Sequence, residues 1–170
     1  HGVVDLSGDI PRFNFISDVT RINLLPLNLA NDSISFRGKL DFNFSSNNID
    51  NFLGVAKITD GMIIRNNHSL QIDSFIADAR YIDGVKHLIV NSKELSAEVN
   101  GDFGLKDLPN SFRLVLNKYY PSYIKAPSGL IRDQAFNFKI RTEYMDDLLK
   151  IFSDDISGFN GSELSGQLNT

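Results

Sequence analysis

The sequence contains no cysteine, which excludes disulfide bonds, thiolate metal sites and cysteine nucleophiles but leaves the cellular compartment open. Basic residues are never clustered, because no run of lysine or arginine occurs anywhere in the chain. The formal net charge is −4 and the isoelectric point is about 5.3, so the chain offers nucleic acid no general electrostatic attraction. We therefore expect no nucleic-acid partner.

Long apolar runs are also missing. No stretch approaches the roughly 18–20 residues of a membrane-spanning helix, and the first residues lack the pattern of a signal peptide. The opening His1-Gly2 resembles the remnant of a cleaved tag, and the chain ends inside a strand-like run, Leu164 to Leu168. We therefore expect an excised internal segment in which residues 3–170 form a single β-rich region.

Motifs for catalysis and for cofactor or metal binding are absent from the sequence as well. It has no Gly-x-Ser-x-Gly, phosphate-binding loop, dinucleotide fingerprint or calcium-binding loop. His68 and His87 lie in or beside expected turns with no second ligand at metal-binding spacing, as is typical of surface histidines. The pairs Asp146-Asp147 and Asp154-Asp155 fit a helix start and a solvated helix end. We expect neither an enzyme nor a bound metal or cofactor.

The strongest positive feature is the strict alternation in Ile34–Phe44, ISFRGKLDFNF, which predicts a long β-strand with one apolar face. Each large apolar side chain gains about 1.5–3 kcal/mol on burial, so the five on this face represent roughly 7–15 kcal/mol. That face must be covered. The cover could be a second sheet, the helices of this chain, or a molecule other than this chain.

Similar patterns predict most of the remaining elements. Two short helices are expected, one after the start signals Asp107 and Pro109 and ending at Pro121, the other over Glu143–Phe152. Arg21–Leu29 reads as a helical turn and a connection, because Pro26 opposes a long helix. Turns are expected at 45–48, 60–61, 66–68 and 83–84. Further strands are expected at 12–15, 53–59, 62–65, 70–81, 87–92, 95–105, 136–142 and 164–168.

Two features indicate internal repetition. Phe-Asn-Phe occurs at Phe13–Phe15 and Phe136–Phe138, and apolar-x-Gly-x-apolar occurs at Phe36–Leu40 and Leu164–Leu168. The offsets of 123 and 128 residues fit one repeat of about 125 residues, so the chain would hold about 1.3 copies. Chance is the alternative, since short apolar-glycine patterns are common. Glycines inside strands indicate a sheet that curves at regular places.

Taken together, these patterns predict a mostly β, mixed α+β fold. We expect an elongated, curved antiparallel sheet with two short helices on its apolar side.

The segment LPNSFRLVLNKYYPSYI, directly after LSAEVNGDFGLKDL, resembles the TamB branch of the AsmA-like family, especially its versions from Bacteroidota. In those chains a strand ending in a Gly-Asp-Phe-type turn is followed by a Leu-Pro-x-Ser helix and a Tyr-x-Pro exit. The hairpins between Gly54 and Phe103 are similar to those that recur in the family. The resemblance covers roughly residues 10 to 170 and includes no catalytic motif.

The resemblance implies a taco-shaped sheet folded around an apolar groove that accepts phospholipid acyl chains. It also implies a parent protein of the periplasm, anchored in the inner membrane of a Gram-negative bacterium and joined to an Omp85-type outer-membrane partner. Its implied roles are phospholipid transport between the two membranes and outer-membrane protein assembly. The candidate lining residues are Ile34, Phe36, Leu40, Phe42, Phe44, Ile72, Val99, Phe103, Phe136, Phe138 and Ile140.

Other interpretations of the same residues remain open. For each candidate, ordinary core packing explains an apolar side chain at least as well as lipid contact does. A self-contained structural or adhesive β-domain of the cell envelope would show the same alternation, but it would close its own core and bind no ligand. A carbohydrate-active domain would need clustered exposed aromatic residues and paired carboxylates, which this sequence does not favour.

Overall fold

The computed structural model describes residues 1–23, 33–66, 68–119, 121–122, 125–128, 132–151 and 157–170. In this part of the chain, nine strands form one antiparallel sheet in the order of the sequence. They are β1 (Gly2–Asp5), β2 (Arg12–Asn23), β3 (Ile34–Ser45), β4 (Leu53–Arg65), β5 (His68–Ile82), β6 (Val85–Ser92), β7 (Leu95–Asp102), β8 (Ala135–Thr142) and β9 (Ser162–Asn169). The helices are η2 (Ile49–Asn51), a 3-10 turn, α1 (Leu108–Tyr119) and α2 (Met145–Lys150).

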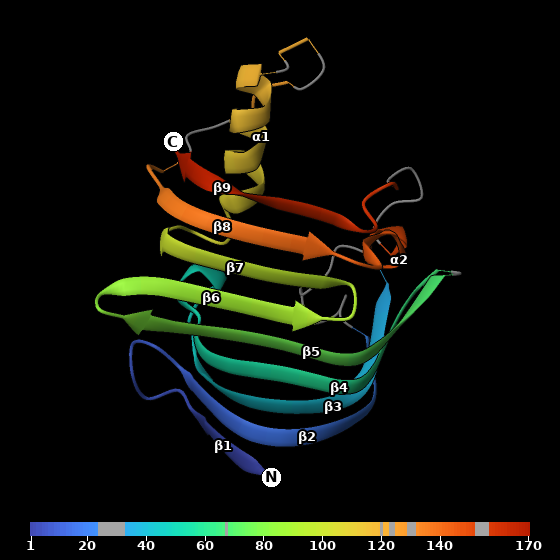
Figure 1. Ribbon diagram of the computed structural model, residues 1–170. Helices are drawn as coiled ribbons and strands as arrows, with labels where there is room; N and C mark the ends of the chain where they lie inside the picture. Colours follow the sequence, from blue (N-terminus) through green and yellow to red (C-terminus); the bar gives the residue numbers. More distant parts are fainter. Residues whose placement is uncertain (24–32, 67, 120, 123–124, 129–131, 152–156) are drawn as a thin grey trace.

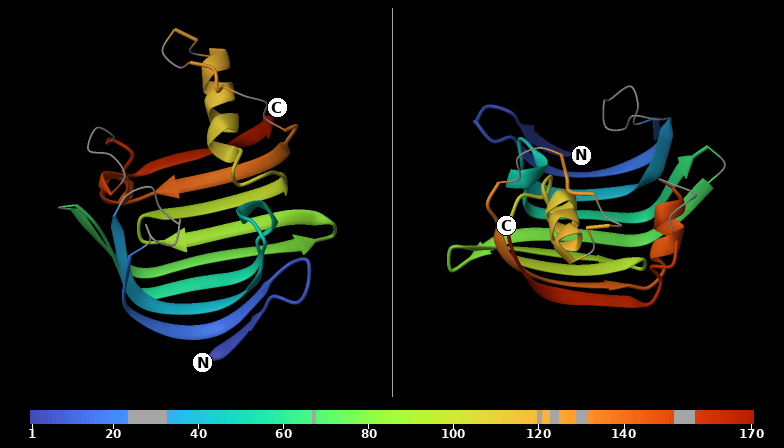
Figure 2. Two further views of the ribbon diagram at one scale, coloured as in Figure 1. Left: turned by 180° about the vertical axis from the view of Figure 1, so that it is seen from behind. Right: turned by 90° about the horizontal axis from the view of Figure 1, so that it is seen from above.

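The sheet is curved and does not close on itself, because β1 pairs only with β2 and β9 pairs only with β8. In Figure 1 the strands β4 to β9 face the reader while β2 and β3 curve behind them. The view from behind in Figure 2 shows η2 and α1 in front of the concave face. The expected mostly β fold, with a curved antiparallel sheet and two short helices, is confirmed.

The bend in the sheet is located around Gly38 of β3. The ladder to β2 shifts between Val19 and Ile22, and the ladder to β4 shifts between Arg37 and Lys39. Gly38 is buried with a φ of +150°, and a Cβ on it would lie 2.8 Å from the Cα of Gly61. Register shifts of this kind bend and twist a sheet locally, so the close approach of two glycine backbones accompanies the bend.

The prediction of a turn at Asp60-Gly61 is wrong. Strand β4 continues through both residues to Arg65, and its register with β5 is the same on both sides of Asp60. Asp60 has a φ of +52°, a conformation that aspartate tolerates. It lies at the register shift between β4 and β3, so it forms part of a strand irregularity and not of a turn. By contrast, the chain does turn at Asp83-Gly84, where both residues have positive φ and join β5 to β6.

Three other boundaries differ from the expectation. Arg21–Asn23 belong to β2 because Ile22 and Asn23 pair with β3, while the rest of the expected helical turn, 24–29, lies outside the described residues. Strand β7 ends at Asp102, so Phe103 lies in the following loop. Helix α2 is shorter than Glu143–Phe152, since the Glu143 N–H donates to the Glu94 carbonyl instead. Phe152 lies outside the described residues.

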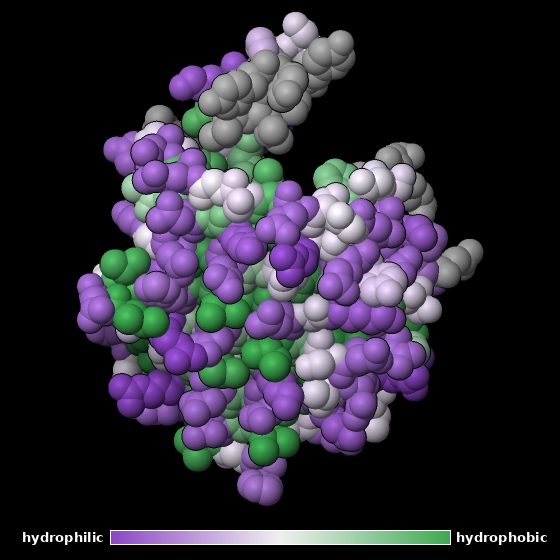
Figure 3. Space-filling model, viewed as in Figure 1, coloured by the Kyte–Doolittle hydropathy of each residue, from purple (hydrophilic) through white to green (hydrophobic). Residues whose placement is uncertain are grey.

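The convex face of the sheet is mainly polar. Figure 3 shows hydrophilic side chains over most of the face seen in Figure 1. Arg141 and Lys139 of β8 pair there with Glu163 of β9, at 2.8 and 3.4 Å. Apolar side chains gather at the tip of the β5–β6 hairpin, where Ile82 and Val85 are exposed. Alternation along the strands therefore separates a polar face from an apolar one, as the sequence predicts.

Gly158 and Phe159, which precede β9, are held by the carboxylate of Asp146 in α2. Its two oxygens accept the N–H groups of Gly158, at 3.0 Å, and Phe159, at 2.8 Å. These two hydrogen bonds lower the pKa of Asp146 below its ordinary value of 3.8. Because the pKa is lower in the folded state, the stabilisation is present above the unfolded-state pKa and is lost as the pH falls through the folded-state pKa.

Replacing Asp146 with asparagine is therefore expected to lower the free energy of unfolding at pH 7 and to have a diminishing effect below about pH 4. Denaturant titrations of both proteins between pH 7 and pH 2 measure this difference. Asp147→Asn is the control, since the Asp147 carboxylate forms an exposed ion pair with Lys150, at 3.3 Å. A constant difference between wild type and Asp146→Asn over the whole pH range would contradict the expectation.

Candidate functional site

The concave face carries rows of directly opposed apolar residues that cross the sheet from strand to strand. One row, named here the Val99 row, contains only apolar residues and glycine across eight strands. Its members are Phe13, Phe44, Gly54, Ala79, Leu88, Val99, Phe138 and Gly166. The Ile140 row beside it is also entirely apolar. Its members are Phe15, Phe42, Ala56, Ala77, Val90, Ala97, Ile140 and Leu164.

At three places in these rows, a phenylalanine ring lies directly opposite glycine or alanine on the next strand. Phe44 lies opposite Gly54, Phe42 lies opposite Ala56, and Phe138 lies opposite Gly166. A Cβ on Gly166 would lie 3.3 Å from the ring of Phe138, so that ring occupies the space beside the glycine. A bulky ring can fill the space beside a residue with little or no side chain, so the face can curve without leaving a gap.

One end of the concave face is closed by the chain itself, in a cluster named here the α1-side core. Phe112 of α1 lies 4.9 Å from the ring of Phe138 and 6.2 Å from that of Phe136. Phe52, which follows η2, packs against the same cluster. The fully buried members are Ala79, Leu88, Val99, Phe103, Phe136 and Leu168. These side chains are removed from water without any ligand.

The other end is closed by α2, in the α2-side core. Ile151 at the C-terminal end of α2 is buried against Leu70 and Ile72 of β5, and Leu148 packs beside it. The guanidinium of Arg65 donates to the Ile151 carbonyl at 2.8 Å, which fixes the end of the helix to β4. Ile58, Ile63 and Phe75 surround this second cluster.

Between the two cores, the Ile140 row has no fully buried member. Its residues are half-buried from β2 to β8, and Leu164 of β9 is 55% exposed. On β2 and β3 the row joins a group of rings in edge-to-face and tilted contact, with Phe15 5.3 Å from Phe42 and Phe42 5.4 Å from Phe44. The concave face therefore keeps an apolar surface that the chain covers only in part.

The structure separates the eleven candidate lining residues into two groups. Five are buried in the chain's own packing, namely Phe36, Ile72, Val99, Phe103 and Phe136. Six are half-buried, namely Ile34, Leu40, Phe42, Phe44, Phe138 and Ile140. Lipid contact stays a prediction for all eleven, and the half-buried group is the one whose surface is still accessible.

Sequence reasoning missed several residues of this face. Phe13 and Phe15 lie on the two rows beside Phe44 and Phe42, and their alternation in RFNF was a signal that could have placed them there. Lys86 was also missed. It falls in phase with Leu88 and Val90 on β6, which was the available sign that a cation enters the apolar face.

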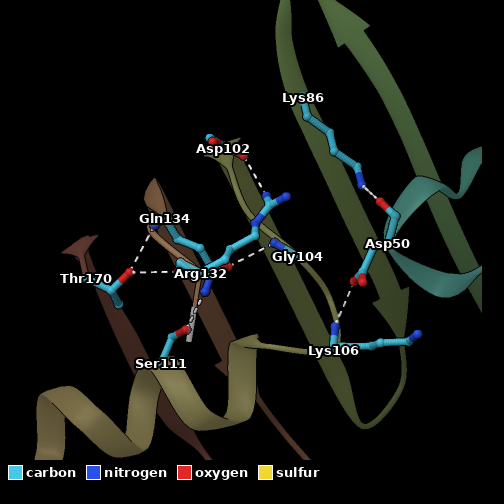
Figure 4. A network of polar contacts seen from close by, with 9 residues as sticks. All are labelled: Asp50, Lys86, Asp102, Gly104, Lys106, Ser111, Arg132, Gln134 and Thr170. Atoms are coloured by element: carbon cyan, nitrogen blue, oxygen red, sulfur yellow. Dashed lines mark hydrogen bonds and ion pairs between the residues drawn. The ribbon is translucent and has the colours of Figure 1, made fainter. Parts of the chain in front are cut away.

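A polar network borders the α1-side core where β7 ends and β8 begins (Figure 4). The buried amide of Gln134 accepts the Gly104 N–H at 2.9 Å and donates to the Ser111 hydroxyl. The Ser111 hydroxyl in turn donates to the Asp107 carbonyl at 2.9 Å, in the first turn of α1. These bonds hold α1 against the sheet and satisfy the buried polar groups, so Ser111 has a structural role here.

In the described part of the chain, no three histidine or acidic side chains are placed to hold a metal ion. None of the described helices has the length and apolar character needed to cross a membrane. Comparison with family models, curated proteins and solved structures finds no match for this chain.

Proposed function

We propose that the chain is an internal segment of a TamB/AsmA-like bridge protein whose concave face accepts phospholipid acyl chains. It would lie in the periplasm, between an inner-membrane anchor and an Omp85-type partner, and serve phospholipid transport or outer-membrane protein assembly. One observation carries the proposal. The half-buried Ile140 row crosses eight strands and contains only apolar residues.

The size and chemistry of the Ile140 row suit acyl chains. Seven steps between strands, at about 4.8 Å each, give a row roughly 34 Å long. One leaflet of a bilayer with a hydrocarbon core of about 30 Å contributes about 15 Å, so the row is longer than one acyl chain. Each methylene group removed from water contributes about 0.8 kcal/mol, and an apolar lining imposes no cost for buried charge.

The α1-side core favours a second candidate, a structural or adhesive envelope domain with no ligand. Val99, Phe103 and Phe136 are each less than 5% exposed, so part of the expected groove is filled by the chain itself. The two candidates differ in the fate of the half-buried row. In a lipid-binding segment, acyl chains replace the water that contacts this row, whereas in a structural domain the row stays hydrated.

Photocrosslinking can distinguish these candidates with two neighbouring positions. Phe15 points to the concave face, and Ile16 is 61% exposed on the opposite face of the same strand. Benzoylphenylalanine at either position keeps an aromatic or apolar side chain in the strand. After expression in a bacterial periplasm and irradiation, we expect phospholipid adducts at position 15 and not at position 16, measured by mass spectrometry of the purified chain.

Lipid extraction of the unmodified chain gives a second measurement, because bound phospholipid should co-purify and appear in the organic phase. Equal adducts at positions 15 and 16 would indicate nonspecific contact with membranes. No adduct at position 15, together with a lipid-free extract, would favour the structural domain.

A further inference from the structure

A cleft of about 450 Å³ opens at one end of the concave face, beside the tip of the β5–β6 hairpin. The residues that matter for its chemistry are Tyr81, Lys86, Asp102, Phe103 and Arg132, together with Asp50 of η2. Tyr81, Lys86 and Gly101 are directly opposed on β5, β6 and β7, and this row continues to Phe136 and Leu168 of the α1-side core. The cleft therefore joins charged groups to the apolar face.

Lys86 is the unusual group in this cleft, because it is a lysine that is only 6% exposed. Its ammonium donates to the backbone carbonyl of Asp50 and lies 5.0 Å from the ring centroid of Phe103. It forms no ion pair with any residue that the structure describes. Within the described residues, this buried cation therefore contacts a carbonyl and a ring but no carboxylate directly.

The second cation, Arg132, approaches from the segment that precedes β8 (Figure 4). Its Nη2 pairs with the Asp102 carboxylate at 2.6 Å, and both side chains are at least half exposed. Such an exposed pair contributes little stability, so the guanidinium can take an additional or alternative anion at small cost. Burial lowers the pKa of Lys86, and the nearby charge of Arg132 lowers it further, against opposing effects of Asp50 and Asp102.

The two carboxylates near Lys86 are already engaged. The Asp102 carboxylate pairs with Arg132, and Figure 4 shows the Asp50 carboxylate turned away from Lys86 toward the Lys106 N–H, which it accepts at 2.9 Å. Of the two cations that line the cleft, Lys86 is therefore the one without a direct ion pair to any described residue. An anion in the cleft would meet Lys86 and Arg132 together, in a partly buried site where charge pairing is stronger than in water.

We propose that this cleft binds the phosphate group of a phospholipid head group, with Lys86 and Arg132 as its ligands. This inference rests on the proposed function, because it locates the head group of the amphiphile whose acyl chains follow the concave face. Lysine supplies a point charge and arginine a planar fork of donors, a combination suited to phosphate oxygens. The cleft volume lies within the range of small-molecule sites. Free phosphate shares this chemistry, so the test separates the two sources.

The experiment titrates the isotope-labelled chain with three soluble probes and follows amide chemical shifts. The probes are dihexanoylphosphatidylglycerol below its micellar concentration, dihexanoylglycerol with the same tails and no phosphate, and inorganic phosphate. We expect the phosphate-bearing lipid to shift the amides of Gly84 and Gly101 and to bind at least about tenfold more tightly than either other probe. Lys86→Met is expected to weaken its binding about tenfold and to leave dihexanoylglycerol binding unchanged.

Two further variants keep the test independent of folding. Arg132→Gln alters a half-exposed side chain and should weaken binding of the phosphate-bearing lipid in the same way. Lys93→Met is the matched control, because Lys93 lies beyond the other end of β6 and has the same 5.0 Å contact with an aromatic ring, that of Tyr144. This variant should bind all three probes as the wild type does.

Each outcome has a defined meaning. Wild-type affinity for the phosphate-bearing lipid in both Lys86→Met and Arg132→Gln would overturn the proposed site. Equal affinity for inorganic phosphate and the lipid would overturn the head-group assignment and identify free phosphate as the ligand. If dihexanoylglycerol does not bind but the lipid binds through Lys86, the phosphate site stands and the acyl-chain function fails.

Discussion

Replacing Phe136 with alanine is expected to lower the free energy of unfolding by about 3–5 kcal/mol. Phe136 is 1% exposed, and its ring lies 6.0 Å from that of Phe103 and 6.2 Å from those of Phe112 and Phe138. Truncation would remove the ring that joins α1 to the sheet and leave a cavity that the rigid strands on either side cannot fill. Urea denaturation followed by circular dichroism measures the change.

Phe159→Ala is the matched control for this substitution. Phe159 is 49% exposed in the segment before β9, so the same change of side chain should alter stability by less than about 0.5 kcal/mol. A loss below about 1 kcal/mol for Phe136→Ala would mean that the α1-side core is not a packed core. The half-buried rows would then be the main apolar feature of the fold.

Replacing Gly101 with alanine is expected to cost about 2–6 kcal/mol, the sum of backbone strain and of steric overlap. Gly101 has a φ of +139°, which side chains of L-residues rarely adopt. Its added Cβ would lie 2.3 Å from the Ala135 carbonyl oxygen and 2.7 Å from the Phe136 Cα, so β7 and β8 would have to separate. A thermal melt should show a fall of roughly 4–24 °C, at about 2–4 °C per kcal/mol for a chain of this size.

Gly8→Ala provides the comparison for Gly101→Ala. A Cβ at Gly8 would have its nearest neighbour at 3.9 Å, and the residue lies outside the strands. Its effect should be neutral or slightly stabilising, since alanine restricts the unfolded chain. Similar melting temperatures for wild type and Gly101→Ala would show that β7 and β8 can move apart freely at this point.

Much of the fold could be predicted from alternation. Ile34–Phe44 forms most of β3, and the hairpin at Asp83-Gly84 has the expected turn. The prediction of a turn at Asp60-Gly61 is wrong for a physical reason, because aspartate and glycine occur both in turns and in strand irregularities. Which of the two forms depends on whether the next segment pairs onward with β3 and β5, and this is decided by contacts far apart in the sequence.

The candidate site was predictable only in part, for the same reason. Phe42 and Phe136 have similar strand patterns, FNF in both cases, yet Phe42 is half-buried and Phe136 is fully buried. The difference comes from Phe112 of α1, which packs over Phe136. The surroundings of Lys86 were equally hidden, because Asp50 and Arg132 reach its cleft from segments 36 and 46 residues away in the sequence.

By itself, the sequence determined which face of each strand is apolar, because side chains alternate along an extended backbone whatever the strand pairs with. It also determined where the strands are interrupted by two short helices. Only the tertiary structure decided how much of the apolar face the chain covers, since that depends on where α1 and α2 dock. Local periodicity records the face that a side chain points to, whereas burial depends on what packs against that face.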